Sequence, residues 1–206
     1  MGEYRTIKQP ARAEFIEKRS RFIGTITPVS TEEAALDFIK QIKQEFWDAT
    51  HNVYAYVLKE GQIRRYSDDG EPKGTAGVPV LDVLLKEELV NCAVVVTRYF
   101  GGIMLGAGGL VRAYSHGAKI AVDAAQVVTM KPCYLCKIIC EYSQYDMLNN
   151  MIQKHGCTVE NVEFTDKVSV YYLISKDIIG KFDKQLNENF FGTLKATILS
   201  ENFAAF

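Results

Sequence analysis

Residues 98–114, RYFGGIMLGAGGLVRAY, carry the strongest structural signal in the chain. The preceding run 92–97, CAVVVT, is apolar and β-branched without a helical period, which predicts a buried strand. From Leu110 to Gln126, small and apolar residues recur at spacings of three and four, which predicts a helix. The five glycines between these elements predict a strand-to-helix turn, because glycine permits positive φ and a close approach of the backbone.

Positive charge surrounds this turn. Arg98 precedes it, and Arg112, His116 and Lys119 recur at helical spacing after it. Free N–H groups at a helix start favour an anion, so we interpret the stretch as an anion-binding or nucleic-acid-binding surface. The alternative is a tight turn beside an ordinary solvated face. The phosphate-loop and dinucleotide fingerprints are both missing. The candidate binding residues are Arg98, Tyr99, Gly101, Gly102, Gly106, Gly108, Arg112, His116 and Lys119, with Lys73 and Thr75 from a second loop.

The second loop spans residues 67–79, SDDGEPKGTAGVP, and its glycines and prolines predict an irregular segment before a helix. Asp68, Asp69 and Glu71 form a possible acidic site, because clustered carboxylates suit a magnesium ion or acid–base chemistry. Two plainer interpretations stay open. The acids form a solvated turn, or they hold the loop through ion pairs with Arg64, Arg65 or Arg98.

The length of 206 residues and the composition are those of a globular protein. The net charge of −1 excludes a surface that is positive overall. No apolar run approaches the about 20 residues of a membrane span, and the first residues lack a signal-peptide core, so we expect a cytoplasmic protein. Cys133 and Cys136 are two of five cysteines, which we expect in the core of a reduced protein. We predict no metal site and no cofactor.

The rest of the chain predicts two domains, 1–130 and 131–206. Before residue 98 we expect two strands or one long bent strand over 12–28, a helix over 31–46 with a Ser30 and Glu33 capping box, and a hairpin over 53–67. Residues 127–132 are predicted to be a short connection. The remainder follows the order β-α-β-β-α-β, which is that of a ferredoxin-like sandwich, so the whole chain is predicted to be α+β.

Several motifs together resemble the YigZ/IMPACT family in its bacterial two-domain form. They are Ser20-Arg21-Phe22, His51-Asn52 and the two glycine-rich stretches. The resemblance covers essentially the whole chain. It implies an amino-terminal α/β sandwich similar to domain two of the S-five type of ribosomal protein, and a carboxy-terminal domain similar to domain five of elongation factor G. Eukaryotic relatives restrain a kinase of a translation initiation factor, but the RWD-type domain of those relatives is not seen here, so we do not extend that role to this chain.

Our first hypothesis is a non-enzymatic, translation-associated protein that binds structured RNA, the ribosome or a ribosome-associated protein. Arg98, Arg112 and Lys119 would contact phosphate, and Tyr99 or Phe100 would stack on a base. The resemblance brings no catalytic residues, so none is assigned. The alternatives are a magnesium-dependent enzyme acting on a phosphorylated small molecule and a protein–protein adaptor. The sequence does not define the oligomeric state.

Overall fold

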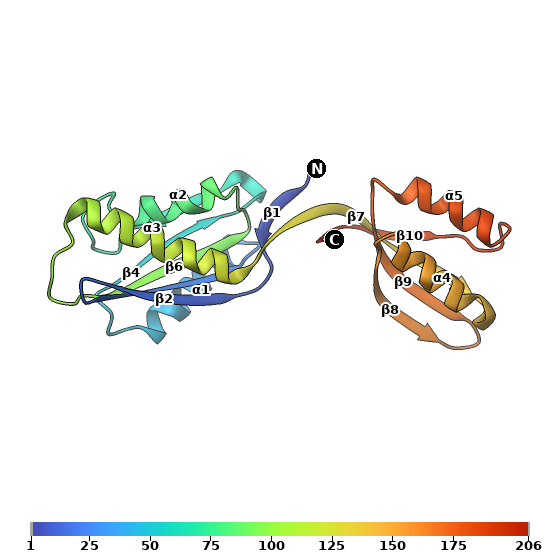
Figure 1. Cartoon of the computed structure of the whole chain (residues 1–206), viewed down its shortest axis with the longest axis horizontal. Coiled ribbons are helices and arrows are strands. Elements are labelled where there is room, and N and C mark those ends of the chain that lie inside the picture. Colours follow the sequence, from blue (N-terminus) through green and yellow to red (C-terminus); the bar gives the residue numbers. More distant parts are fainter. Residues whose placement is uncertain (1, 206) are drawn as a thin grey trace. The chain divides into compact units, whose positions relative to one another are not determined.

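The structure is a computed structural model that describes residues 2–205. The chain divides into two compact units, one formed by Tyr4–Val128 and one formed mainly by the residues from Thr129 onward (Figure 1). Within residues 2–205 there are two antiparallel sheets and five α-helices, which confirms the predicted α+β class. None of the helices in this part of the chain is long and apolar enough to cross a bilayer.

The first unit is built on a five-stranded antiparallel sheet in the order β2-β3-β6-β4-β5. The apolar run of the sequence forms the central strand, β6, which pairs with β3 on one side and β4 on the other. Residues 12–28 form two paired strands, β2 and β3, and not one bent strand, and the predicted hairpin over 53–67 is confirmed as β4–β5. The strands are β2 (Ala11–Glu17), β3 (Ser20–Pro28), β4 (His51–Val57), β5 (Arg64–Ser67) and β6 (Cys92–Tyr99), with a 3-10 turn at Glu60–Gln62.

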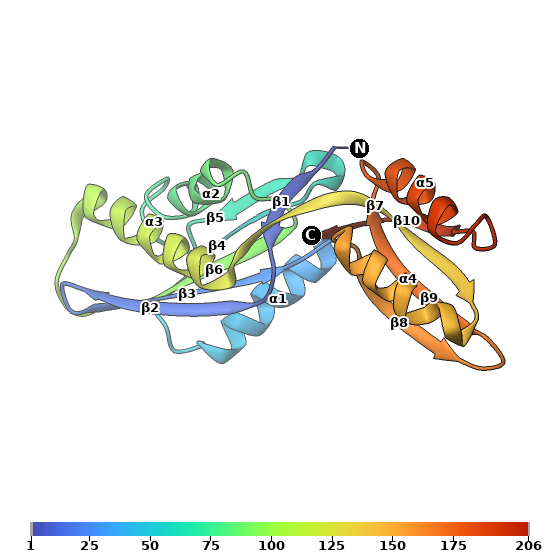
Figure 2. The ribbon, with the colours of Figure 1, turned by 45° about the vertical axis from the view of Figure 1, so that its right-hand side comes forward.

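Helices cover both faces of this sheet (Figure 2). Because side chains alternate along a strand, Val94 and Val96 of β6 pack with α2 (Gly77–Lys86) and α3 (Gly106–Ala125), whereas Ala93 and Val95 pack with α1 (Glu32–Glu45). Each apolar residue of the central strand is therefore buried, which explains why the run shows no alternation of apolar and polar residues.

Two helix starts differ from the sequence predictions. The cap of α1 is Thr31, whose hydroxyl accepts from the Ala34 amide, and not Ser30. Helix α3 begins at Gly106, four residues before the predicted start at Leu110, so Gly106 and Gly108 lie at the start of the helix and not in a loop. The turn is made by the residues before them, and Gly106 enters the helix with a φ of +71°.

The second unit has the predicted β-α-β-β-α-β order, with the strands arranged β10-β7-β9-β8 and β1 also paired with β7. This confirms the ferredoxin-like prediction. One correction concerns residues 127–132, which are part of β7 and not a connection, because β10 pairs with β7 as far back as Met130. The elements of this unit are β7 (Val127–Cys140), α4 (Tyr142–Lys154), β8 (Thr158–Phe164), β9 (Val168–Ser175), α5 (Ile179–Asn189) and β10 (Thr197–Ala205). Strand β1 (Tyr4–Ile7) belongs to the first unit.

Candidate anion-binding site

The loop between β6 and α3 is fastened to the β2–β3 turn. The Gly101 amide donates to the Ser20 hydroxyl over 3.1 Å. A Cβ added at Gly101 would lie 2.1 Å from the backbone carbon of Arg19, so only glycine fits at this contact. The basic turn at Lys18 and Arg19 is thereby held beside the loop that leads into α3.

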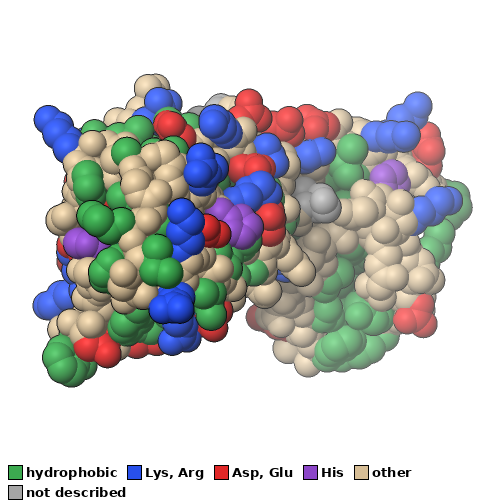
Figure 3. Space-filling model, turned by 60° about the vertical axis from the view of Figure 1, so that its left-hand side comes forward, with side chains coloured by type: hydrophobic (Ala, Val, Ile, Leu, Met, Phe, Trp, Pro, Cys, Tyr) green, Lys and Arg blue, Asp and Glu red, His purple; other side chains and the backbone are tan. Residues whose placement is uncertain are grey.

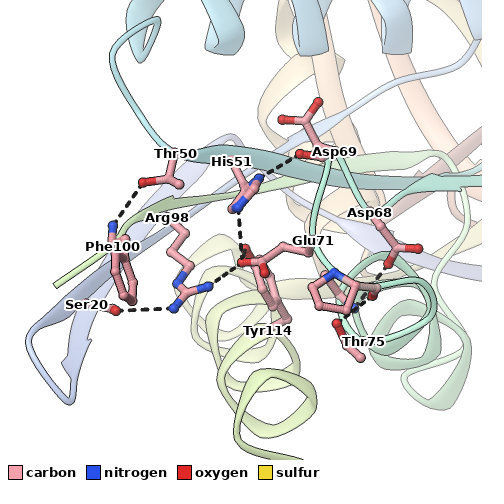
Figure 4. Close-up of polar contacts among 12 residues, drawn as sticks. Ser20, Thr50, His51, Asp68, Asp69, Glu71, Thr75, Arg98, Phe100 and Tyr114 are labelled. Carbon is pink, nitrogen blue, oxygen red and sulfur yellow. Dashed lines mark hydrogen bonds and ion pairs between the residues drawn. The ribbon is translucent and has the colours of Figure 1, made fainter. Parts of the chain in front are cut away.

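Arg98 lies inside the protein. Its Nη1 donates to Oε1 of Glu71 over 2.6 Å, and the two side chains are only 6% and 4% exposed (Figure 4). The Tyr114 hydroxyl donates to the same oxygen over 2.7 Å. His51 Nε2 lies 3.8 Å from it. The prediction that Arg98 contacts phosphate is therefore corrected. Its guanidinium is buried and is neutralised by the carboxylate of Glu71.

The buried network keeps Tyr114 protonated. Burial raises the pKa of Tyr114 well above its usual range, and the charge of Glu71 raises it further. The guanidinium of Arg98 also lies 5.5 Å from the Phe22 ring centre and 5.3 Å from that of Phe100. Its Nε has no hydrogen-bond partner among the described residues. These contacts indicate that Arg98 has a structural role.

The acidic residues of the second loop also have structural partners. Asp68 accepts from the backbone amides of Gly74, Ala76 and Gly77 at 2.9, 3.2 and 2.8 Å, and so closes the start of α2 (Figure 4). Burial opposes ionisation of this carboxyl, but the backbone amides together lower the pKa of Asp68. Asp69 accepts from the Asn52 amide over 2.6 Å and pairs with a lysine, Lys43.

The three carboxylates thus contact different partners. Within residues 2–205, no three His, Cys, Asp or Glu side chains lie together in a way that could hold a metal ion. The interpretation that ion pairs hold the loop is confirmed for Glu71, which pairs with Arg98. Asp68 instead accepts from backbone amides, and Asp69 accepts from a backbone amide and pairs with Lys43. Arg65 instead lies 3.9 Å from Glu32.

A pocket of about 320 Å³ lies beside the first turns of α3, and we call it the α3 pocket. Arg112 and His116 come from the helix, and both are exposed. Lys18 comes from the β2–β3 turn, more than 90 residues earlier in the chain. The pocket is lined by Phe15, Glu17, Lys18, Leu105, Gly109, Arg112, Ala113 and His116.

The carboxylate of Asp68 accepts from the amides at the start of α2, whereas the start of α3 has no such contact from a side chain. No side chain caps it, and no acidic residue lies in its first turn. The guanidinium of Arg112 lies over this turn, since Nη1 would be 3.7 Å from a Cβ added at Gly108. A guanidinium therefore adds positive charge at the positive end of the helix dipole, which is an arrangement that attracts anions.

The other predicted residues are dispersed. The hydroxyl of Tyr99 donates to Asp48 over 2.8 Å, and Tyr99 does not line the α3 pocket. Lys119 pairs with Asp123 and lies 3.5 Å from Glu87. Thr75 donates to the Pro72 carbonyl. Lys73 and Gly102 are exposed, and neither Lys73 nor Thr75 lines the α3 pocket.

Sequence reasoning found Arg112 and His116 but missed Phe15, Glu17 and Lys18. The basic turn at residues 18–21 was the only signal available for this side of the pocket. Figure 3 shows hydrophobic side chains beside Lys, Arg and His side chains on one face of the first unit. Exposed apolar residues at this end of α3 are Phe100, Ile103, Met104 and Val111.

Two family models match the chain. Residues 18–122 match the Impact N-terminal domain, and residues 138–193 match a domain of unknown function, DUF1949. The protein YvyE of Bacillus subtilis, named an IMPACT family member, is 37% identical over 91% of this chain and 87% of its own length. This chain belongs to the IMPACT family.

Other members of the IMPACT family extend the comparison. YigZ of Escherichia coli is 31% identical over 89% of this chain and 92% of its own length. The protein named IMPACT of Rattus norvegicus is 32% identical over 46% of this chain and 31% of its own length. A solved structure titled "Crystal structure of an hypothetical protein" is 29% identical, with a TM-score of 0.61 over 97% of this chain and 98% of that one.

Proposed function

We propose that this IMPACT family member is a non-enzymatic binding protein that holds structured RNA through the α3 pocket and the uncapped start of α3. One observation carries the proposal: Lys18, Arg112 and His116, from two elements far apart in the sequence, line one pocket at a helix start that has no acidic residue in its first turn.

Electrostatics favours a phosphate-bearing ligand at this surface. Within residues 2–205, neither Arg112 nor Lys18 forms an ion pair, so their charges are not already neutralised. Phosphate contacts from Arg and Lys supply most of the affinity in nucleic-acid binding. Because the net charge of the chain is −1, such binding depends on this local surface and not on an overall positive field.

Exposed apolar side chains next to these charges favour RNA over a small anion. Phe100 and Met104 are 48% and 86% exposed in the loop that precedes α3. Unpaired RNA bases stack on aromatic side chains, whereas a free phosphate gains nothing from an apolar surface. The translational setting of the RNA is supported by the resemblance of both halves of the chain to domains of the ribosome and of elongation factor G.

The proposal is tested by measuring the binding of the full chain to a fluorescent stem–loop RNA over a series of salt concentrations. We expect affinity at low salt and a linear fall of log K with log salt. Arg112→Ala should reduce the slope by about 0.7–0.9, the contribution of one phosphate contact. Arg112→Lys should keep the slope.

The matched control is Lys40→Ala, which removes one exposed positive charge from α1 on the opposite face of the sheet. Its slope should equal that of the wild type. The proposal is wrong if no RNA binds at low salt, or if Arg112→Ala and Lys40→Ala behave alike.

A protein–protein adaptor is the second candidate function. The sheet of the second unit carries a pocket of about 450 Å³ where Leu135, Tyr171 and Leu173 lie beside Glu160 and Glu163. Mixed apolar and charged lining of this kind is common at protein interfaces. A pull-down that keeps its partner after nuclease treatment, and loses it on Tyr171→Ala, would favour the adaptor. The enzyme alternative was based on Asp68, Asp69 and Glu71, and each of these carboxylates contacts partners within the protein.

A further inference from the structure

The lining of the α3 pocket is not that of a simple phosphate site. Phe15, Leu105 and Ala113 give it an apolar part, while Lys18 and Arg112 bring positive charge. Glu17 also lines the pocket, and within residues 2–205 it forms no ion pair. A carboxylate repels a phosphate, so the group inside the pocket should be uncharged, with phosphates held at the positive side chains around it.

We infer that the α3 pocket receives one unpaired nucleobase of the bound RNA, while Arg112 and Lys18 contact the phosphates on either side. This inference rests on the proposed function, since it specifies which part of the RNA the pocket takes. A base is flat and largely apolar on its faces and carries hydrogen-bonding groups on its edges. The pocket offers apolar surface together with a few polar groups, as small-molecule sites do.

Two residues provide the recognition. His116 is exposed, and its ring packs on Phe15 with ring centres 4.6 Å apart at 75°, which fixes its orientation beside the pocket. Phe15 is itself stacked on Phe22 at 5.1 Å, so both rings have support from the core. Histidine is one of the side chains on which RNA bases stack.

Glu17 determines which bases fit. An ionised carboxylate only accepts hydrogen bonds, so it pairs with the exocyclic amino group of adenine, cytosine or guanine. Uracil has no exocyclic amino group, and its one base-pairing donor, the N3–H, lies between two carbonyl oxygens that the carboxylate repels. The pocket should therefore discriminate against uracil. Its volume of about 320 Å³ lies at the lower end of the range of about 300–1,000 Å³ for small-molecule sites, which suits a single base.

The experiment compares four RNAs with one stem, using anisotropy with the full chain. One has an adenine loop, one a uracil loop, one a loop of abasic nucleotides, and one is a blunt duplex without a loop. We expect the adenine loop to bind at least about fivefold more tightly than the abasic loop. This factor corresponds to the lower end of the stacking free energy of one base on an aromatic side chain. The uracil loop should bind more weakly than the adenine loop.

Three variants separate base recognition from phosphate binding. His116→Ala should reduce binding to the adenine loop at least about fivefold and leave the abasic loop unaffected. Glu17→Gln should make the adenine and uracil loops bind alike, because the amide both donates and accepts. Lys40→Ala should change neither the preference for the adenine loop over the abasic loop nor that for the adenine loop over the uracil loop. Thermal unfolding of each variant checks that the fold is retained.

The outcomes are distinguishable. If all four RNAs bind equally and Arg112→Ala still lowers the salt slope, the base pocket is wrong and the proposed function stands. If Glu17→Gln or His116→Ala changes all four RNAs by the same factor, the base pocket is also wrong. Failure of every RNA to bind overturns both proposals. Equal stabilisation by free adenosine monophosphate and by the adenine loop would identify a mononucleotide site and overturn the RNA assignment.

Discussion

The guanidinium of Arg98 and the carboxylate of Glu71 meet inside the first unit, with Nη1 and Oε1 2.6 Å apart. Arg98 is the second-last residue of the central strand, and Glu71 comes from the loop before α2. The pair therefore joins the two glycine-rich segments of the sequence. Tyr114 of α3 donates to the same carboxylate, so three elements meet at one buried charge.

Removing either partner of this pair should destabilise the first unit strongly. Glu71→Ala or Arg98→Ala leaves an unpaired buried charge, which costs about 3–5 kcal/mol. The double variant should lose less than the sum of the two single variants, because neither charge is then left alone. Urea unfolding followed by circular dichroism measures these free energies. A loss below about 1 kcal/mol in each single variant would show that the pair is not structurally important.

Asp68 should stabilise the start of α2 in a pH-dependent way. Its pKa is lowered in the folded chain, so its contribution is present above the unfolded pKa and is lost as the pH falls through the lower folded value. We expect Asp68→Ala to cost about 1–2 kcal/mol near neutral pH, as loss of a helix cap does. The difference from the wild type should shrink once the pH falls below about 4. A pH-independent difference in unfolding free energy would contradict this role.

Two glycines should respond oppositely to replacement by alanine. Gly101→Ala places a Cβ 2.1 Å from the backbone of Arg19, so the loop before α3 must shift and the unfolding free energy should fall by about 2 kcal/mol or more. Gly180→Ala in α5 meets open space and should stabilise the second unit by about 0.4–1 kcal/mol. Urea unfolding of both variants checks the pair. Equal effects would mean that the contact at Gly101 does not constrain the loop.

The five cysteines should be unreactive in the folded protein. All are buried, and burial raises the pKa of the Cys92 thiol to about 12 and that of Cys157 to about 12. A thiol reagent at neutral pH should therefore modify none of them rapidly before unfolding and all five in denaturant. Fast modification of a native cysteine would identify a region that opens locally.

Several structural elements were predictable from local sequence. The apolar run before Arg98 predicted a buried strand, the spacing in residues 31–46 a helix, and the β-α-β-β-α-β order a ferredoxin-like unit, and the structure has all three. The predictions failed at element boundaries. Residues 127–132 were predicted to be a connection, but they begin strand β7, and residues 130–132 of it pair with β10. The local sequence pattern does not predict such pairing between distant segments.

The sequence by itself determined which apolar runs are buried, where the chain turns, and that basic residues accompany glycine around α3. These properties follow from periodicity, backbone freedom and composition, which act over a few neighbouring residues. Only the tertiary structure decided that Arg98 is buried against Glu71, while Arg112 stays exposed beside Lys18 and Phe15. Both arginines flank the same glycine-rich stretch, and their different roles arise because sheet pairing and helix packing bring a carboxylate into an ion pair with Arg98 and not with Arg112.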